Sequence, residues 1–396
     1  MNNINQVSLR GKRVLVRVDF NVPLDKHYNI TDDSRIVAAL PTIKKIITDG
    51  GKAIIMSHLG RPKNGFEEKF SLKHTVQHLS RLLGQNVSFS DDCIGENTIS
   101  DIAKMNNKDV LVLENLRFYS EEKKGDIGFA NQLANLADVY VNDAFGTAHR
   151  AHASTAIIAQ FFPNDKYFGY LLCSEIESLE KALENPERPF TAIIGGAKIT
   201  GKIDVITSLF DKVDNLIIGG GMAYTFAKAM GGKIGKSLIE EEKVSLAKQL
   251  IEDAKKKGVR LLLPTDSINA DNFNNEANTN ISNILEINSD YMGLDIGKES
   301  IIHFSETIRN SQTIIWNGPM GVFEMEKFEK GTKEIGEAIC FATENGAFSL
   351  VGGGDSIAAV KKFGFANRVS YISTGGGAML NYLEGKQLPG VIAIQD

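Results

Sequence analysis

The chain has 396 residues, of which 42% are hydrophobic and 23% charged, a composition typical of a soluble globular protein of about two or three domains. Its formal net charge of −5 excludes a bulk attraction to nucleic acid or to an anionic membrane, so we expect neither as a partner. The three cysteines form no CxxC pair, which disfavours a disulfide framework and favours a reducing, cytoplasmic location. No apolar signal segment opens the chain, and no run of about 18 apolar residues predicts a membrane span.

Short apolar runs recur in the first half of the chain, each followed by a loop and a helical pattern. Runs that are apolar throughout are typical of strands buried on both faces of a parallel sheet. The four runs of this half cover residues 13–20, 53–57, 110–115 and 138–142.

The second half repeats this plan. Its runs cover residues 190–196, 215–220, 260–266, 313–318, 348–353 and 369–376. A helical stripe separates the halves, formed by Leu172, Ile176, Leu179 and Leu183 and ended by Pro186 and Pro189. The sequence therefore predicts an α/β protein with two doubly wound, Rossmann-like parallel-sheet domains joined by a helix and a hinge.

Polar side chains follow each predicted strand of the first half. They are Asp19, Asn21 and Arg35, then His58 and Arg61, then Arg117, then His149, Arg150 and His152. Because ligands of open parallel sheets bind at the carboxyl ends of the strands, these groups should meet at one edge. Arginine suits phosphate and carboxylate oxygens, so this edge predicts a pocket for a small, strongly anionic molecule. A solvated surface arginine is the alternative for any single one of them.

The stretch "NDAFGTAHRAHAS" (142–154) has three interpretations. Anion capture needs only the cationic and hydrogen-bonding groups that are present. Histidines with a structural role in a loop, or a metal site, are alternatives, although an arginine between the histidines would repel a metal ion. A nucleophile at Ser154 is disfavoured because no G-x-S-x-G elbow surrounds it.

The predicted strands of the second half deliver glycines instead. The glycine-rich stretches are "GGAKITGK" (195–202), "GGGMAYTF" (219–226), "NGPMGVFE" (317–324), "GGGDS" (352–356) and "STGGGA" (373–378). Glycine lets backbone N–H groups approach phosphate oxygens, although tight turns between strands and helices also favour it. With Lys198, Lys202 and Asp355 among them, these loops favour a nucleotide polyphosphate with Mg²⁺.

Two known nucleotide motifs are not matched. Gly196–Lys202 fits G-x-x-x-x-G-K, but Ile203 stands where a Walker A motif needs a hydroxyl. Met230 similarly replaces the first glycine of a motif ending at Ser237. Tyr224 replaces the third glycine of a dinucleotide fingerprint, which disfavours an NAD-dependent dehydrogenase as an alternative function.

The ordered motifs of the whole chain resemble those of the phosphoglycerate kinase family. The stretches that carry this resemblance are "RVDFNVPL", "SHLGRP", "LENLRF", "NDAFGTAHRAHAS", "GGAK", "GGGMAYTF", "GPMGVFE", "GGGDS" and "STGGGA". The resemblance implies reversible, Mg²⁺-dependent phosphoryl transfer between 1,3-bisphosphoglycerate and ADP on one side and 3-phosphoglycerate and ATP on the other. It implies direct in-line transfer after domain closure, and a monomer.

The resemblance also implies the site residues. For phosphoglycerate they are Asp19, Asn21, Arg35, His58, Arg61, Arg117 and Arg150. For the nucleotide they are Lys198, Lys202, Gly293, Asn317, Glu324, Gly352, Gly353, Gly354, Asp355 and Ser356. Asp355 should face the metal and Glu324 the ribose, while Arg35, Lys198 and Gly376 (with the backbone of 375–377) should act on the transferred group.

The implied domains are 1–170 for phosphoglycerate and 171–382 for the nucleotide, with the tail 383–396 folded back on the first. In the stretch that begins with GGAK, the family often has an acid just before the second lysine. Here that lysine is Lys202, and Gly201 precedes it. Phosphoryl transfer to an ionised carboxylate needs no general base, which agrees with the residues found. A non-enzymatic two-domain anion-binding protein is the other alternative, and it gives Asp355 and the glycine loops no purpose.

Overall fold

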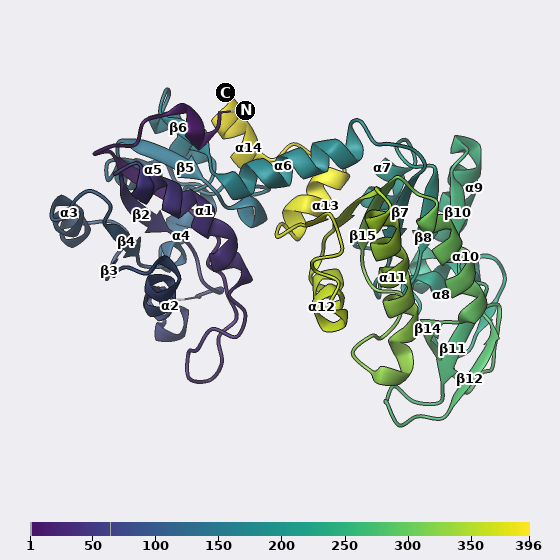
Figure 1. The fold of residues 1–396 in the computed structure, drawn as a ribbon. Helices are drawn as coiled ribbons and strands as arrows, with labels where there is room; N and C mark the ends of the chain where they lie inside the picture. Colours follow the sequence, from purple (N-terminus) through teal and green to yellow (C-terminus); the bar gives the residue numbers. More distant parts are fainter. Residues whose placement is uncertain (1, 64) are drawn as a thin grey trace. The chain divides into compact units, whose positions relative to one another are not determined.

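The computed structural model describes residues 2–63 and 65–396. The chain divides into two compact units (Figure 1). Unit 1 comprises Met1–Glu177 together with Gln387–Asp396, and unit 2 comprises Ser178–Lys386. Helix α6 (Tyr170–Leu183) begins in unit 1 and ends in unit 2, which confirms the helix predicted from the leucine stripe.

Unit 1 is built on a six-stranded parallel sheet in the order β3-β4-β2-β1-β5-β6. The strands are β1 (Arg13–Arg17), β2 (Lys52–Met56), β3 (Val87–Ser90), β4 (Val110–Leu113), β5 (Val139–Asn142) and β6 (Lys166–Phe168). Every residue of β4 and β5 is buried, as expected for apolar runs covered on both faces. The four predicted strands are confirmed, and they are the four central strands of the sheet.

Helices surround this sheet, and the C-terminal tail packs on it. The helices are α1 (Ser34–Thr48), α2 (Lys73–Leu83), α3 (Glu96–Ala103), α4 (Ser120–Lys124), α5 (Ile127–Ala134) and α14 (Pro389–Gln395). Figure 1 shows α14 beside the N-terminus of the chain, where Asn2 Nδ2 donates to the carbonyl oxygen of Ile394 at 3.3 Å. Gly390 N donates to the carbonyl oxygen of Ala148 at 2.9 Å, so the tail contacts the segment that carries the histidines.

Unit 2 contains a second six-stranded parallel sheet in the order β10-β8-β7-β15-β16-β17. Its strands are β7 (Phe190–Ile194), β8 (Asn215–Ile218), β10 (Arg260–Leu262), β15 (Thr313–Asn317), β16 (Phe348–Val351) and β17 (Tyr371–Ile372). All six were predicted from apolar runs. The helices are α7 (Ile203–Leu209), α8 (Met222–Ala229), α9 (Val244–Lys257), α10 (Lys298–Arg309), α11 (Lys330–Glu344), α12 (Gly354–Phe363) and α13 (Gly377–Leu383).

Two small sheets in unit 2 were not predicted. An antiparallel sheet has the order β12-β11-β14, from Thr279–Asn283, Asp266–Ala270 and Met292–Ile296. A two-stranded parallel sheet pairs β9 (Lys233–Ile234) with β13 (Glu286–Ile287). Short 3₁₀ helices complete the chain: η1 (Ile4–Gln6), η2 (Glu68–Phe70), η3 (Leu116–Phe118), η4 (Phe145–Thr147), η5 (Ile157–Phe161), η6 (Glu241–Lys243) and η7 (Glu326–Phe328).

Among the described residues, no helix combines the length and the hydropathy that a membrane crossing requires.

Candidate active site

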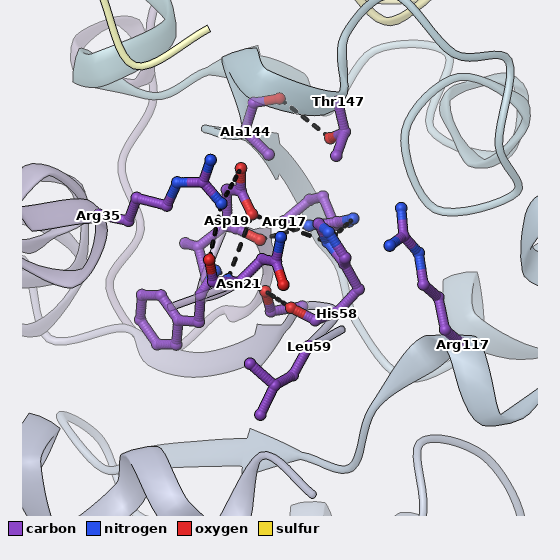
Figure 2. Close-up of polar contacts among 12 residues, drawn as sticks. Arg17, Asp19, Asn21, Arg35, His58, Leu59, Arg117, Ala144 and Thr147 are labelled. Carbon is purple, nitrogen blue, oxygen red and sulfur yellow. Dashed lines mark hydrogen bonds and ion pairs between the residues drawn. The ribbon is translucent and has the colours of Figure 1, made fainter. Parts of the chain in front are cut away.

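The predicted cationic edge of unit 1 forms at the carboxyl ends of β4, β2, β1 and β5, which lie next to one another in the sheet. Figure 2 shows Asp19, Asn21, Arg35, His58 and Arg117 gathered at this edge. Each comes from a loop or helix start that follows one of these strands, as the sequence predicted. The parallel arrangement therefore brings together groups that are up to about a hundred residues apart in the chain.

Arg35 extends from the first turn of α1 toward the loop after β1. Its Nη1 donates to the carbonyl oxygen of Asn21 at 2.7 Å and lies 3.5 Å from Asp19 Oδ2. The Asn21 side chain is fixed in turn, because its Oδ1 accepts from Gly60 N at 2.8 Å. These contacts hold the guanidinium of Arg35 in one place before any ligand binds.

Arg17, which the sequence analysis did not single out, lies fully buried beneath this cluster. Its Nε donates to Ser154 Oγ at 2.8 Å, and its Nη2 lies 3.2 Å from His58 Nδ1 (Figure 2 shows the two side chains together). Because a guanidinium can only donate, His58 Nδ1 must be the acceptor, which leaves the proton of the neutral ring on Nε2. Burial, followed by the charge of Arg17, lowers the pKa of His58 well below its usual value and keeps the ring neutral.

Arg117 adds a second buried charge on η3. Its Nη1 donates to the carbonyl oxygen of Gly60 at 2.8 Å, while its Nε is buried and has no hydrogen-bond partner among the described residues. Burial, and then the charges of Arg17 and Arg150, lower its pKa to about 10, so it remains cationic at neutral pH. An arriving anion would relieve the repulsion among these arginines.

The loop after β5 carries Arg150 between two histidines. Arg150 N donates to the carbonyl oxygen of Thr147 at 3.0 Å, and its Nε lies 3.1 Å from His149 Nε2. Burial and neighbouring arginines lower the pKa of His149 and bring that of His152 to about 3, so both rings are neutral near pH 7. Among the described residues, no group of three or more His, Cys, Asp or Glu side chains is arranged to hold a metal ion.

Arg61 shows no contact with the other members of the predicted cationic set among residues 2–63 and 65–396. It is exposed on the loop after β2, one position beyond Gly60. The remaining members of the set are linked through hydrogen bonds, ion pairs or the effect of one group's charge on the pKa of another, as described above. The role of Arg61 stays a prediction.

Four of the five glycine-rich stretches of unit 2, all except 373–378, contribute residues to the lining of a cavity of about 690 Å³. Its walls include Leu238, Phe273, Met292, Val322 and Met325, so the cavity is largely apolar, with Glu324, Lys236 and Asp355 as charged residues at its border. Gly293 lies in the wall of the cavity. A Cβ at this position would lie 2.1 Å from the Tyr224 hydroxyl oxygen, so a larger residue would require Tyr224 to shift. A largely apolar cavity lined by a few polar groups is the usual form of a small-molecule binding site.

The polar groups of this site converge at the ends of β7, β15 and β16. Lys202 Nζ contacts Asn317 Oδ1, and Asn317 Nδ2 donates to the carbonyl oxygen of Gly352 at 2.8 Å. Ser356 Oγ, fully buried, accepts from Gly318 N at 2.6 Å. Burial lowers the pKa of Lys202 to about 8, although the charge of Asp355 acts in the opposite direction.

Helices begin where the sequence predicted them after the last two glycine loops. Gly353 is the N-cap residue of α12 with a φ of +94°, a backbone conformation that favours glycine, and Asp355 lies in the first turn. Gly376 is the N-cap residue of α13. Lys198 lies between β7 and α7 in the same loop as Lys202. The structure therefore brings Lys202, Asp355 and the first turn of α12 together at this edge of the sheet, a setting suited to phosphate groups, while Lys198 is exposed on the loop before α7.

Comparison with known proteins identifies the family of the chain. The family model described as phosphoglycerate kinase matches residues 4–386. A protein of Porphyromonas gingivalis named phosphoglycerate kinase is 54% identical over 416 residues, covering 99% of each chain. The chain belongs to the phosphoglycerate kinase family.

Other relatives extend this result. The chloroplastic phosphoglycerate kinase 1 of Arabidopsis thaliana is 53% identical over 100% of this chain and 82% of its own. The solved structure of phosphoglycerate kinase from Coxiella burnetii matches with a TM-score of 0.90 and 42% identity, covering 99% of this chain and 98% of that one. As a member of the family the chain is a phosphotransferase with a carboxyl group as acceptor, which transfers a phosphoryl group between 1,3-bisphosphoglycerate and ADP and 3-phosphoglycerate and ATP in glycolysis.

Proposed function

We propose that the cationic cluster of unit 1 binds the phosphoglycerate, through Asp19, Asn21, Arg35, His58, Arg61, Arg117 and Arg150. The observation that carries this proposal is the group of buried or half-buried arginines, Arg17, Arg117 and Arg150. After burial itself, the charges of Arg17 and Arg150 lower the pKa of Arg117, and the three arginines lower the pKa values of His58 and His152. A molecule with a phosphate at one end and a carboxylate at the other would neutralise them. The neutral rings of His58 and His149 add hydrogen-bonding capacity without adding charge.

Within this site the arginines divide the work. Arg150, on the loop after β5, holds the phosphate that does not react. Arg35 meets the phosphoryl group in flight, because its guanidinium is held by Asp19 and Asn21 in a fixed position with further N–H groups available. A fixed donor stabilises developing charge without reorganising during the reaction.

In unit 2 we propose that the apolar cavity holds the base of ATP or ADP, with Gly293 in its wall and Glu324 toward the ribose. Lys198, Lys202, Asn317 and Ser356 then serve the phosphate end, together with backbone of 352–354 and 375–377. The links from Lys202 to Asn317 and from Asn317 to Gly352 support this arrangement. Lys198 and the backbone N–H of Gly376 act on the transferred phosphoryl group.

Mg²⁺ accompanies the nucleotide, and Asp355 is its protein ligand in this proposal. Magnesium is usually bound by one or two carboxylates plus substrate phosphates and water, so a single acid in the first turn of α12 fits the ion. When bound, the ion neutralises phosphate charge. Asp355 orients the nucleotide's phosphate end, and Lys202, with a pKa near 8, keeps most of its positive charge beside it at neutral pH.

The chemistry uses these residues to position and to neutralise. The acceptor carboxylate of 3-phosphoglycerate is ionised at neutral pH, so no side chain needs to remove a proton. Arg35 and Lys198 supply positive charge to the moving group from the two substrates' sides, and transfer is direct and in line. The protein works as a monomer in the cytoplasm. Residues 1–170 together with 383–396 form the domain for phosphoglycerate, and residues 171–382 form the domain for the nucleotide.

A coupled assay of ATP consumption tests the proposal. Consumption should depend on 3-phosphoglycerate and on Mg²⁺, and removal of the ion with a chelator should abolish it. Arg150→Ala should weaken the binding of 3-phosphoglycerate only, and Lys202→Ala should weaken the binding of the nucleotide only. Activity that persists without divalent metal, or a Lys202→Ala enzyme with unchanged nucleotide affinity, would overturn these assignments.

A further inference from the structure

Glu240 contacts the loop that carries both phosphate-site lysines, although it lies 40 positions further along the chain. We call residues 196–202 the lysine loop. Glu240 Oε2 accepts from Ile199 N at 2.5 Å and from Thr200 N at 3.2 Å, and its Oε1 accepts from Thr200 Oγ1 at 2.5 Å. One carboxylate therefore receives three hydrogen bonds from two adjacent residues of the lysine loop.

The charge state of Glu240 agrees with this role. Burial alone would raise the pKa of its carboxyl group. The hydrogen bonds from Thr200 and Ile199, together with the positive charge of Lys198, outweigh burial and lower the pKa. The group is ionised at neutral pH, so all three hydrogen bonds are charge-assisted and stronger than their neutral counterparts.

The backbone around Glu240 is anchored to α8 and to a residue of the cavity wall. Glu240 N donates to Thr225 Oγ1 of α8 at 3.3 Å, and Thr225 is buried. Three residues earlier, Ser237 Oγ accepts from Gly293 N at 2.9 Å, and Leu238 lines the cavity. The segment 237–240 thus contacts both the wall that contains Gly293 and the lysine loop.

The lysine loop contains no acid of its own, because its sequence is GAKITGK with Gly201 before the second lysine. Lys198 immediately precedes Ile199, and Lys202 comes two positions after Thr200. Lys202 N also donates to the carbonyl oxygen of Ile199 at 2.8 Å. Fixing the backbone at residues 199 and 200 therefore restricts the backbone positions of Lys198 and Lys202, from which both side chains extend.

We infer that Glu240 is a positioning residue for nucleotide phosphates, holding the lysine loop in its binding geometry through Ile199 and Thr200. The inference rests on the proposed phosphate-binding role of Lys198 and Lys202. Glu240 touches no substrate in this scheme and acts only through the loop. Preorganised cationic groups bind and stabilise transferred charge without a reorganisation cost, so releasing the loop should weaken nucleotide binding and slow transfer.

The test compares Glu240→Ala and Glu240→Gln with Glu241→Ala, a matched control at an exposed acid next in the chain. Calorimetric titration with ADP and Mg²⁺, in the absence of phosphoglycerate, should give a Kd raised about tenfold for Glu240→Ala, as expected for losing a charge-assisted contact. The kcat should fall as well, while the KM for 3-phosphoglycerate stays as in wild type. Glu240→Gln should recover most of the affinity, since its amide oxygen can still accept from Ile199 N.

Lys198→Ala, measured in parallel, separates the two claims. If Lys198→Ala leaves the kcat unchanged, the proposed phosphate site is wrong. If Lys198→Ala loses activity while Glu240→Ala behaves like Glu241→Ala, the inference about Glu240 is wrong. A loss of 3-phosphoglycerate affinity equal to the loss of ADP affinity would show a general structural defect and would also overturn it.

If Glu240→Ala fails to fold, the Kd of Thr200→Val for ADP tests the inference instead. It removes the hydrogen bond to Glu240 Oε1 and leaves the two backbone hydrogen bonds in place. A smaller rise in the Kd for ADP, with the KM for 3-phosphoglycerate as in wild type, supports the inference. A Thr200→Val enzyme with wild-type affinity for ADP contradicts it.

Discussion

Replacing Arg35 with alanine should reduce the kcat far more than it changes the KM for 3-phosphoglycerate. In the structure only Nη1 is engaged in described contacts, with Asn21 and Asp19, so the other guanidinium N–H groups can face a ligand. Loss of one preorganised donor to developing charge costs about 10²–10³ in kcat, or roughly 2.7–4 kcal/mol of barrier. The effect on folding should be much smaller, because an ion pair with a 36% exposed arginine side chain is worth at most about 1 kcal/mol.

Arg150→Ala provides the matched comparison. Arg150 is half-buried on the loop after β5, and its proposed contact with the unreactive phosphate exists before and during transfer. Losing a charge-assisted hydrogen bond worth about 1.5–3 kcal/mol should raise the KM by about 10–100-fold. Some of the kcat should also be lost, because remote binding energy helps to orient the reacting end.

Steady-state kinetics in both directions, with 3-phosphoglycerate varied at saturating nucleotide, measures the two effects separately. Thermal unfolding of each variant controls for loss of folded protein. If Arg35→Ala changes only the KM while Arg150→Ala abolishes the kcat, the two roles have been assigned the wrong way round.

Three further predictions follow from the site. Asp355→Ala should lose activity sharply and raise the Mg²⁺ concentration needed for half-maximal rate; wild-type turnover at low Mg²⁺ would refute the metal assignment. Burial lowers the folded-state pKa of His152 to about 3, below the value of about 6.5 expected in the unfolded chain. The unfolded chain therefore binds a proton more readily, so the free energy of unfolding is highest above pH 6.5 and decreases as the pH falls from 6.5 toward 3. The unfolding free energy of His152→Gln should therefore depend less on pH between about 6.5 and 3 than that of wild type, and equal slopes would contradict this. Small-angle scattering should give a smaller radius of gyration with both substrates bound, since reacting atoms must come within about 3.5 Å; unchanged dimensions would argue against closure from an open form.

The sequence predicted the four central strands of the sheet in unit 1 and all six strands of the main sheet in unit 2, because each of them lies in a largely apolar run. It did not predict β3 and β6, which lie at the two edges of the sheet in unit 1. Their sequences, VSFS and KYF, are short and partly polar, and edge strands need less burial. The small antiparallel sheet was also missed. Its strand β12 (TNISN) alternates between exposed and half-buried residues, and β11 (DSINA) is mostly buried but polar in sequence.

Most of the predicted site residues lie just after a strand, where ligand-binding groups are expected, whereas Gly293 lies within β14 and Asn317 is the last residue of β15. Arg17 was missed because it is the last residue of β1 and was counted as part of an apolar run. An arginine inside a run of buried residues was the signal that could have identified it. Glu240 gave no local signal, because its partners are 40 residues away and only the folded chain brings them together.

The central claim is that unit 1 binds phosphoglycerate and unit 2 binds the nucleotide through separate sets of residues. Isothermal titration of wild type, Arg150→Ala and Lys202→Ala with each substrate alone tests it most directly. Arg150→Ala should weaken 3-phosphoglycerate binding and leave ADP binding unchanged, and Lys202→Ala should show the reverse. The division of the active site described above would be wrong if either variant lost affinity for both substrates equally. It would also be wrong if each variant lost affinity for the substrate assigned to the other unit.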